Sequence, residues 1–479
     1  MAAARTRGLP GRFAAAIAAA SLVAVAAPAA SPAQFAQGEH AYVTTLSSGT
    51  YGYDVASNGA LTPVQGSPFA SGNGGFGLSA TPDRTKLYVS EYGSKRIGGY
   101  DISGPPGGLI PVSGSPFAAP QPVLSAVTPD GHFLYVANDA GDSDPGSVTG
   151  YAISFDGSLH PVPGSPYVAS DLGPYGVAIS PDARYVYVSN TGNSPSENGS
   201  VSAYKSSRRD GSLTELQGSP YTVGVAAGGI ALTPDGKRLY VANGESDSIS
   251  AFKRDAGTGQ LTQLAASPFA VSDGEPTGVV ITPDGQHLYV AVGSMVSQED
   301  NVVDGFSITP TGQLRRVAGA PYAAGLGPQL AALSNDGKSL YVTNNGSQDI
   351  SGYRVAGNGS LAPLPGAPFA TGQNPLGITI PRVPVNDFTI KKVDPYGRAK
   401  AKMKFAIPGP GAVYVAGDGV RKRHRTFRSL TAGLVVEAKG SKKRKLLRRG
   451  KVTVKVDASF LPFGGEKHTK TQRVTLVKR

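Results

Sequence analysis

A short phrase built around a tyrosine and a valine occurs seven times between residues 40 and 344. Its tyrosines, from Tyr42 to Tyr341, are spaced by 46, 47, 52, 53, 49 and 52 residues. The copies are His40–Thr44, Leu87–Ser90, Leu134–Asn138, Val186–Asn190, Leu239–Asn243, Leu288–Val292 and Leu340–Asn344. This period suits one four-stranded blade of a β-propeller, a fold in which each repeat buries its apolar faces against its neighbours.

The fourth repeat shows how one unit is expected to fold. Residues 175–179 are nearly all apolar, as expected for an innermost strand that is buried on both faces. A Ser-Pro-Asp-Ala turn follows, in which proline fixes φ and aspartate hydrogen-bonds its own backbone. Further strands are predicted at 185–189, 200–204 and 213–216, and Gly218–Tyr221 crosses to the next blade. An aromatic residue follows the crossing proline in every repeat, and we expect it to pack between neighbouring blades.

The two ends of the array indicate how the ring closes. The first repeat starts at its second strand near His40, whereas the last innermost strand, residues 375–380, has no second strand after it. Pairing this strand with residues 41–65 completes one mixed blade and removes the edges that an open array would expose. The sequence therefore predicts an all-β chain with a seven-bladed propeller over residues 40–383, closed by its N- and C-terminal strands.

The composition limits the chemistry, and the N-terminus predicts export. The 479 residues include no cysteine and only six histidines, so thiolate sites are excluded and few general bases are available. Arg5, Arg7 and Arg12 precede an apolar stretch at 13–27 that is short for a membrane span, and small residues follow it. We interpret residues 1–33 as a secretory signal, with an uncleaved anchor as the alternative. The mature protein is expected to be secreted or associated with the cell envelope, without a transmembrane segment.

The Tyr-Val-(Thr/Ala/Ser)-Asn phrase, with Pro-Asp-Gly upstream, resembles the YVTN-repeat propellers of the lactonase-like seven-bladed family. That family includes 6-phosphogluconolactonases and carboxymuconate-lactonizing enzymes. The resemblance covers residues 40–383 and implies the seven-bladed fold; it also implies, as one alternative, hydrolysis or formation of a lactone.

The family's enzymes usually carry an Arg-His pair in a Gly-Pro-Arg-His-like phrase before an innermost strand. The matching positions here read Gly274–Thr277 and Gly327–Gln329, without that pair. His132 and His287 adjoin Pro-Asp-Gly turns, where we expect them to be solvated. No catalytic residue is therefore carried over from the family.

The candidate binding site is the loop face, which is formed by the connections between second and third strands and by the blade crossings. Three of these connections are long and acidic, and long loops on a rigid scaffold commonly carry function. The candidate residues are Asn138, Asp139, Asp142, Asp144, Asn190, Glu197, Asn243, Glu245, Asp247, Glu299, Asp300 and Asn344. Asp142 and Asp144 could supply oxygen ligands to Ca²⁺, although a solvated acidic loop is the alternative; no other cofactor is predicted.

Residues 384–479 differ sharply in charge from the repeats. They contain 25 Lys and Arg against 6 Asp and Glu, so they carry +19, whereas residues 1–383 carry −7. Alternation at Lys400–Phe405 and Val452–Val456 predicts strands, and a small immunoglobulin-like sandwich fits. The densest cationic cluster is Lys442, Lys443, Arg444, Lys445, Arg448 and Arg449. It is either a polyanion-binding surface or a solubilising, lysine-rich strand face.

Three functional hypotheses follow from these observations. The sequence favours a monomeric, non-catalytic propeller that binds a glycan, peptide or protein, with the basic domain retained at anionic envelope polymers. The alternative is a lactonase-type hydrolase. A structural or adhesive surface protein is the third. Aromatic residues are few among the basic ones, which argues against specific nucleic-acid binding.

Overall fold

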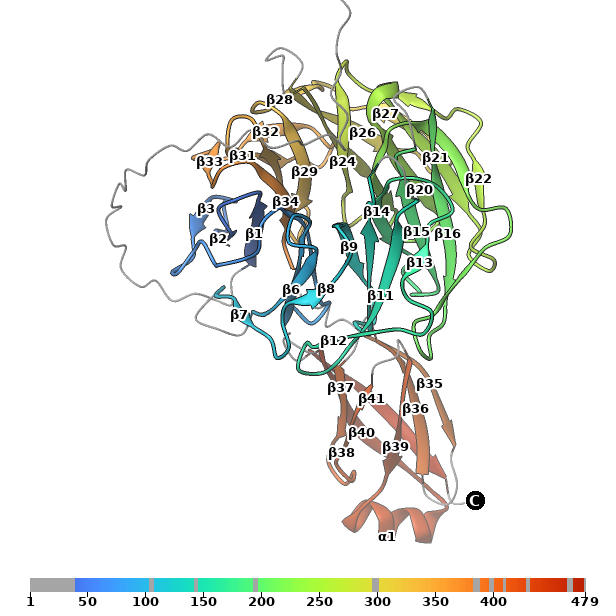
Figure 1. Cartoon of the computed structure of the whole chain (residues 1–479). Coiled ribbons are helices and arrows are strands. Elements are labelled where there is room, and N and C mark those ends of the chain that lie inside the picture. Colours follow the sequence, from blue (N-terminus) through green and yellow to red (C-terminus); the bar gives the residue numbers. More distant parts are fainter. Residues whose placement is uncertain are drawn as a thin grey trace, which may run out of the picture.

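The computed structural model describes residues 39–102, 107–141, 145–192, 197–294, 301–381, 388–395, 400–407, 411–427, 431–462 and 468–477. Seven antiparallel sheets of four or five strands form the propeller, and two further sheets follow it (Figure 1). The fold is thus the predicted all-β propeller followed by a β-domain. The predicted signal lies outside the described residues. No helix of the described chain has the length and apolar character needed to cross a membrane.

The first blade closes the ring with strands from both ends of the repeat array. Its order is β3 (Leu61–Pro63), β2 (Thr50–Val55), β1 (Glu39–Thr45) and β34 (Pro375–Thr379). Tyr42 lies opposite Thr379 in the antiparallel pair of β1 with β34. The predicted mixed blade is therefore confirmed. Glu39 Oε1 also accepts a hydrogen bond from the Asn335 backbone N–H at 2.7 Å, which ties this blade to the seventh.

Each of the other six blades runs outward from an innermost strand, and a fifth short strand from the crossing pairs with its third strand. Blade 2 contains β4 (Gly75–Ala80), β5 (Lys86–Glu91), β6 (Arg96–Asp101), β7 (Ile110–Pro111) and β8 (Phe117–Ala118). Blade 3 contains β9 (Pro122–Val127), β10 (Phe133–Asn138), β11 (Ser147–Ile153), β12 (Leu159–Pro161) and β13 (Tyr167–Val168). Blade 4 contains β14 (Pro174–Ile179), β15 (Tyr185–Asn190), β16 (Asn198–Ser206), β17 (Leu213–Glu215) and β18 (Tyr221–Val225).

The remaining blades repeat this plan. Blade 5 contains β19 (Ala227–Leu232), β20 (Arg238–Asn243), the 3-10 turn η1 (Gly244–Ser246), β21 (Ser248–Arg254), β22 (Leu261–Gln263) and β23 (Phe269–Ala270). Blade 6 contains β24 (Glu275–Ile281), β25 (His287–Gly293), β26 (Val302–Ile308), β27 (Leu314–Arg316) and β28 (Tyr322–Ala323). Blade 7 contains β29 (Pro328–Leu333), β30 (Ser339–Asn344), β31 (Asp349–Val355), β32 (Leu361–Pro363) and β33 (Phe369–Ala370).

The tyrosine of each repeat joins its own blade to the next one. Its ring is fully buried, and its hydroxyl donates to a glycine carbonyl in the outer turn of the following blade. Tyr187 bonds Gly259 O at 2.6 Å, for example, and Tyr341 bonds Gly59 O at 2.7 Å across the point of closure. The other five pairs are Tyr42–Gly107, Tyr88–Gly157, Tyr135–Gly211, Tyr240–Gly312 and Tyr289–Gly359. The repeat spacing is therefore the spacing of seven inter-blade hydrogen bonds.

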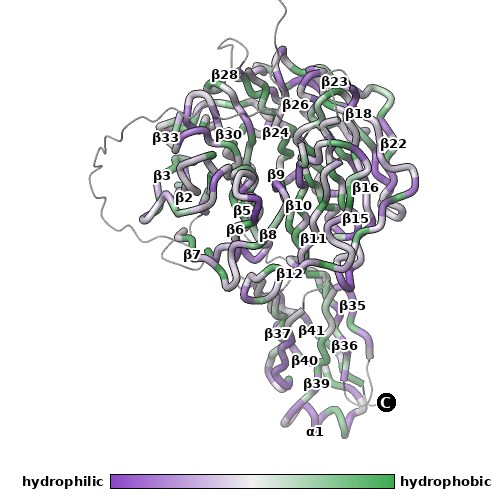
Figure 2. The backbone as a smooth tube through the Cα atoms, viewed as in Figure 1, coloured by the Kyte–Doolittle hydropathy of each residue, from purple (hydrophilic) through white to green (hydrophobic). Residues whose placement is uncertain are grey.

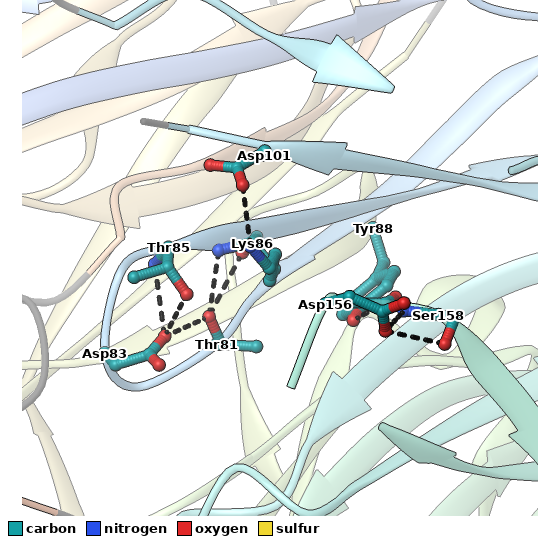
Figure 3. A network of polar contacts seen from close by, with 9 residues as sticks. Thr81, Asp83, Thr85, Lys86, Tyr88, Asp101, Asp156 and Ser158 are labelled. Carbon is teal, nitrogen blue, oxygen red and sulfur yellow. Dashed lines mark hydrogen bonds and ion pairs between the residues drawn. The ribbon is translucent and has the colours of Figure 1, made fainter. Parts of the chain in front are cut away.

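Short polar turns hold the strand ends in each blade. Figure 3 shows that Asp83 Oδ1 accepts hydrogen bonds from Thr81 and Thr85, while Lys86 Nζ contacts Asp101 Oδ2 at 2.7 Å. The same arrangement of a hydroxyl residue and an aspartate follows five other innermost strands, as at Thr233 and Asp235. The predicted Pro-Asp turns thus form.

The C-terminal domain consists of two sheets and one helix. The three-stranded sheet has the order β35 (Thr389–Pro395), β36 (Lys400–Ala406) and β39 (Thr431–Glu437). The four-stranded sheet has the order β38 (Arg423–Phe427), β37 (Gly411–Ala416), β40 (Lys451–Pro462) and β41 (His468–Val477). Their facing residues form one core, and the helix α1 (Gly440–Arg449) inserts Leu446 into it. The sandwich was predicted, whereas the helix was not.

Candidate functional site

Four asparagines that end second strands lie inside their blades rather than on the surface of the loop face. They are Asn138, Asn190, Asn243 and Asn344. Asn190 Nδ2 donates to the Ser200 and Ser202 hydroxyls on the third strand at 3.0 and 2.8 Å. Strand alternation directs these side chains inward, where a buried amide requires hydrogen-bond partners. We expected ligand-binding residues here; the structure instead places an asparagine clamp between the second and third strands.

In blades 2 and 6, charged side chains replace the asparagine clamp between the second and third strands. Glu91 occupies the asparagine position of blade 2, is 1% exposed, and pairs with Arg96 Nε at 2.5 Å. In blade 6, Val292 replaces the asparagine and Asp304 replaces the second hydroxyl residue. Asp304 is fully buried, contacts the Arg316 guanidinium, and accepts from the Ser272 backbone N–H at 2.6 Å. These carboxylates are committed to ion pairs within their blades.

The predicted acidic loop residues that the structure describes belong to three different blades. Asp142, Asp144, Glu299 and Asp300 lie outside the described residues. Glu197 is exposed just before β16, and Glu245 and Asp247 belong to the turn at η1. In the part of the chain that the structure describes, no three His, Asp or Glu side chains are placed to hold a metal ion.

Side chains without acid–base function fill the central channel at the starts of the innermost strands. Phe76, Val123, Tyr175 and Leu376, from four different blades, form one buried cluster. The rings of Phe76 and Tyr175 meet edge to face with centroids 5.9 Å apart, and burial raises the pKa of Tyr175 to about 12. Below this aromatic plug, a cavity of about 140 Å³ is lined by residues such as Gly176, Val279 and Ile378. The plug lies on the side of the channel that blades 1 to 4 form.

A polar cluster, which we call the Asp139 site, lies on the loop face between blades 2 and 3. The Tyr92 hydroxyl donates to Asp139 Oδ2 at 3.4 Å and accepts from Gln121 Nε2 at 3.1 Å. Asp139 Oδ1 accepts from the Gly141 N–H at 3.0 Å, and the Asp139 N–H donates to Gln121 O at 3.2 Å. A cavity of about 220 Å³ adjoins this cluster and is lined by Gln121, Asn138, Asp139 and Val168, among others. The site thus combines a carboxylate with hydroxyl and amide donors.

Sequence reasoning found Asp139 but missed Tyr92 and Gln121. Gln121 occupies the crossing position just before an innermost strand, with a left-handed φ of 43°. The equivalent position is Gly74, Gly173, Gly274, Gly327 or Asn374 in five other blades, and Ala226 in blade 5 shares the left-handed φ at 57°. The signal in the sequence that could have revealed the site is a long polar side chain at a position where the other blades have Gly, Ala or Asn.

The histidines differ in part from the expectation. His287 is buried at the start of β25, only 7% exposed, and packs beneath the outer turn of blade 7 at Gly359. We expected it to be solvated. The inter-blade contact covers it, which the isolated repeat could not reveal.

The six predicted polyanion-binding residues lie on α1, not on a strand. Leu446 anchors the helix, while Lys443, Arg444, Lys445, Arg448 and Arg449 are exposed. Lys442 is partly buried and lies 3.9 Å from Asp418. The strand-face alternative is therefore replaced by a cationic helix of ten residues, which packs on the sandwich through Leu446.

Comparisons with known proteins agree with the fold. Residues 146–277 match the family described as "Lactonase, 7-bladed beta-propeller". A candidate 6-phosphogluconolactonase from Bacteroides uniformis is similar in structure with a TM-score of 0.60 and 18% identity, over 72% of this chain and 99% of that chain. The periplasmic gluconolactonase of Pseudomonas aeruginosa gives 0.57 and 21%, over 71% and 98%. A comparison with curated protein sequences finds no match.

These matches support the lactonase-like propeller family that the repeat resembles. At such identities the structural similarity establishes the fold alone. They also agree better with the lactonase alternative than with the binding role that the sequence favoured.

Proposed function

We propose that this lactonase-like propeller hydrolyses a lactone at the Asp139 site. The observation that carries the proposal is the placement of Asp139, Tyr92 and Gln121 beside a cavity on the loop face. The lactonase family match and the gluconolactonase neighbours suggest the substrate class, a cyclic ester of a sugar acid.

The chemistry needs one base and one stabilised oxyanion. Asp139 takes a proton from a water molecule, whose oxygen then attacks the lactone carbonyl carbon. Gln121 Nε2 carries a second N–H that can donate to the carbonyl oxygen as negative charge develops there. The ring C–O bond then breaks, and the departing alkoxide takes the proton held by Asp139. The product is the open hydroxy acid, and no co-reactant other than water is consumed.

The test is acid release from a panel of sugar-acid lactones, with and without a phosphate group. Asp139→Asn is expected to lower kcat about 100-fold or more, the usual contribution of a general base. Asp156→Asn is the matched control, because Asp156 is an exposed aspartate in the outer turn of blade 3 and holds only Ser158. Equal turnover by Asp139→Asn and the parent protein would reject this mechanism.

A binding role without turnover is the second candidate, and the aromatic plug favours it. The family's Arg-His phrase is missing, and the rings of Phe76 and Tyr175 pack together at the channel entrance. Under this proposal, a glycan, peptide or protein occupies the loop face without being changed. Calorimetry with lactones and their hydrolysed acids separates the two roles, since a binder retains its ligand and releases no acid.

For the C-terminal domain we propose retention of an exported, monomeric protein at anionic polymers of the cell envelope. The cations of α1 and the net charge of +19 over residues 384–479 support it. Co-sedimentation of the whole protein with isolated envelopes, and its release by salt, tests this proposal.

A further inference from the structure

Between β37 and β38, the chain passes briefly beside the other sheet of the sandwich. A cavity lies next to this corner, between β38 and β39. Val420 pairs with Ala438, and the Arg421 N–H donates to Glu437 O at 2.8 Å, next to β39. Two residues later β38 pairs with β37, in the other sheet. β38 and β39 are outer strands of two different sheets. Between them lies a cavity of about 450 Å³, the arch slot, lined by Arg423, His424, Arg425, Gly433, Leu434 and Val435.

Two arginines point into the arch slot from the core side of their sheet. Arg423 lies opposite Val415 and Arg425 lies opposite Val413, and both valines are buried in the core. Directly opposite residues in an antiparallel pair share one face, so both arginines occupy positions at which a core residue is expected. Along a strand they are about 6.8 Å apart. Both arginines therefore line the same small space.

The carboxylate of Glu437 offsets one of the arginine charges around the slot, and the three arginines Arg421, Arg423 and Arg425 leave a net positive charge there. Glu437 stands at the corner, 2.9 Å from Arg423 Nη2 and 3.7 Å from Arg421 Nε. Leu434 and Val435 form the opposite wall and bring no charge. Because β39 is the outer strand of its sheet, some of its backbone N–H groups face the slot. Figure 2 shows that β38 and much of α1 are hydrophilic, and the exposed residues of α1 include Lys443, Arg444 and Lys445.

We propose that the arch slot binds a phosphate group of a linear polyphosphodiester or polyphosphate chain. The planar guanidinium fork matches a phosphate with two parallel hydrogen bonds, which a lysine ammonium cannot reproduce. The inference deepens the proposal of envelope retention. It assigns recognition to the slot and leaves the α1 cations to attract the polymer from a distance. It does not depend on lactone hydrolysis.

The test measures binding of inorganic polyphosphate to the mature full-length chain by calorimetry at low salt. The double variant Arg423→Gln/Arg425→Gln is expected to lose about tenfold in affinity, and the slope of log K against log salt should fall by about 1.4, as for two phosphate contacts on a single strand. Arg423→Lys/Arg425→Lys keeps the charge, and should lose about threefold because the fork is absent. Lys451→Gln/Lys455→Gln, on exposed positions of β40, is the control with the same change of charge.

Four results would overturn the slot. One is an equal loss in the slot and control variants, which would indicate diffuse attraction alone. Another is a larger loss in Lys443→Gln/Lys445→Gln, which would leave retention standing but move recognition to α1. The third is dimerisation or a lowered Tm in the slot variants that accounts for the weaker binding, since inward charges on outer strands also prevent edge pairing. If the parent chain binds no polyphosphate, envelope retention by phosphate polymers fails together with the slot.

Discussion

Blades 4 and 6 solve one structural problem with different chemistry. In blade 4, Asn190 is neutral and its amide joins two serine hydroxyls on the third strand. In blade 6, the fully buried Asp304 contacts the Arg316 guanidinium. A mutation that removes one partner of a neutral clamp loses only hydrogen bonds. A mutation that removes one partner of an ion pair leaves the other charge buried and unpaired. The contact between the second and third strands should therefore differ in its sensitivity to mutation between the two blades.

The largest effect is expected from Arg316→Met. This change leaves the Asp304 carboxylate buried without its cation, so stability should fall by about 3–5 kcal/mol. Urea unfolding followed by tyrosine fluorescence measures the change. Arg315→Met, at the exposed neighbouring position, is the control and should stay within about 0.5 kcal/mol.

Converting blade 6 to a neutral blade should recover most of that loss. Asp304→Ser restores the hydroxyl that blade 4 has at this position, and in the Arg316→Met background it removes the unpaired charge. The double variant should unfold within about 2 kcal/mol of the parent. A double variant as unstable as Arg316→Met alone would show that charge burial is not the cause.

Cutting the neutral clamp of blade 4 should cost less. Asn190→Ala leaves the Ser200 and Ser202 hydroxyls without their amide donor and should lower stability by about 1–3 kcal/mol. Gln263→Ala, on the exposed outer strand β22, serves as the control. If Asn190→Ala lowers stability as much as Arg316→Met does, the proposed distinction between the two blades is wrong.

The hydrogen bond from Tyr187 to the next blade should contribute somewhat less to stability than the asparagine clamp does. Tyr187→Phe keeps the buried ring but removes the donor to Gly259 O, at an expected cost of about 1–2 kcal/mol. Tyr322→Phe should be nearly neutral, because that hydroxyl contacts Ala318 O at an exposed position.

The smallest expected effect is that of Asp235→Asn on stability at low pH. Burial raises the pKa of Asp235, but hydrogen bonds from Thr233 and the Lys237 N–H, with the Lys237 charge, bring it below 3.8. A carboxylate with a depressed folded-state pKa contributes stability that is present above its unfolded pKa and is lost as the pH falls through the folded value. Asp235→Asn should therefore reduce the loss of stability below about pH 4. An unchanged acid profile, measured by urea midpoints, would contradict this role.

The sequence predicted the propeller well because each blade repeats the same local solution. Alternation, Pro-Asp turns and the tyrosine spacing are local signals, and the unmatched strands at both ends specified closure. The candidate site was less predictable. Asn138 and Asn190 are the last residues of β10 and β15, so their burial depends on side-chain direction within a blade. Tyr92 meets Gln121 and Asp139 only because blades 2 and 3 are adjacent.

Some features of this protein follow from the sequence alone, whereas others depend on tertiary contacts. The sequence by itself determined seven blades, the mixed first blade and the charge asymmetry, because periodicity, counting and composition need no contacts. Tertiary structure alone decided that blades 2 and 6 hold ion pairs, that the channel carries an aromatic plug and that α1 is a helix. Each of these depends on which side chains from distant segments share one buried space, and that sharing sets the hydrogen bonding and charge pairing that burial demands.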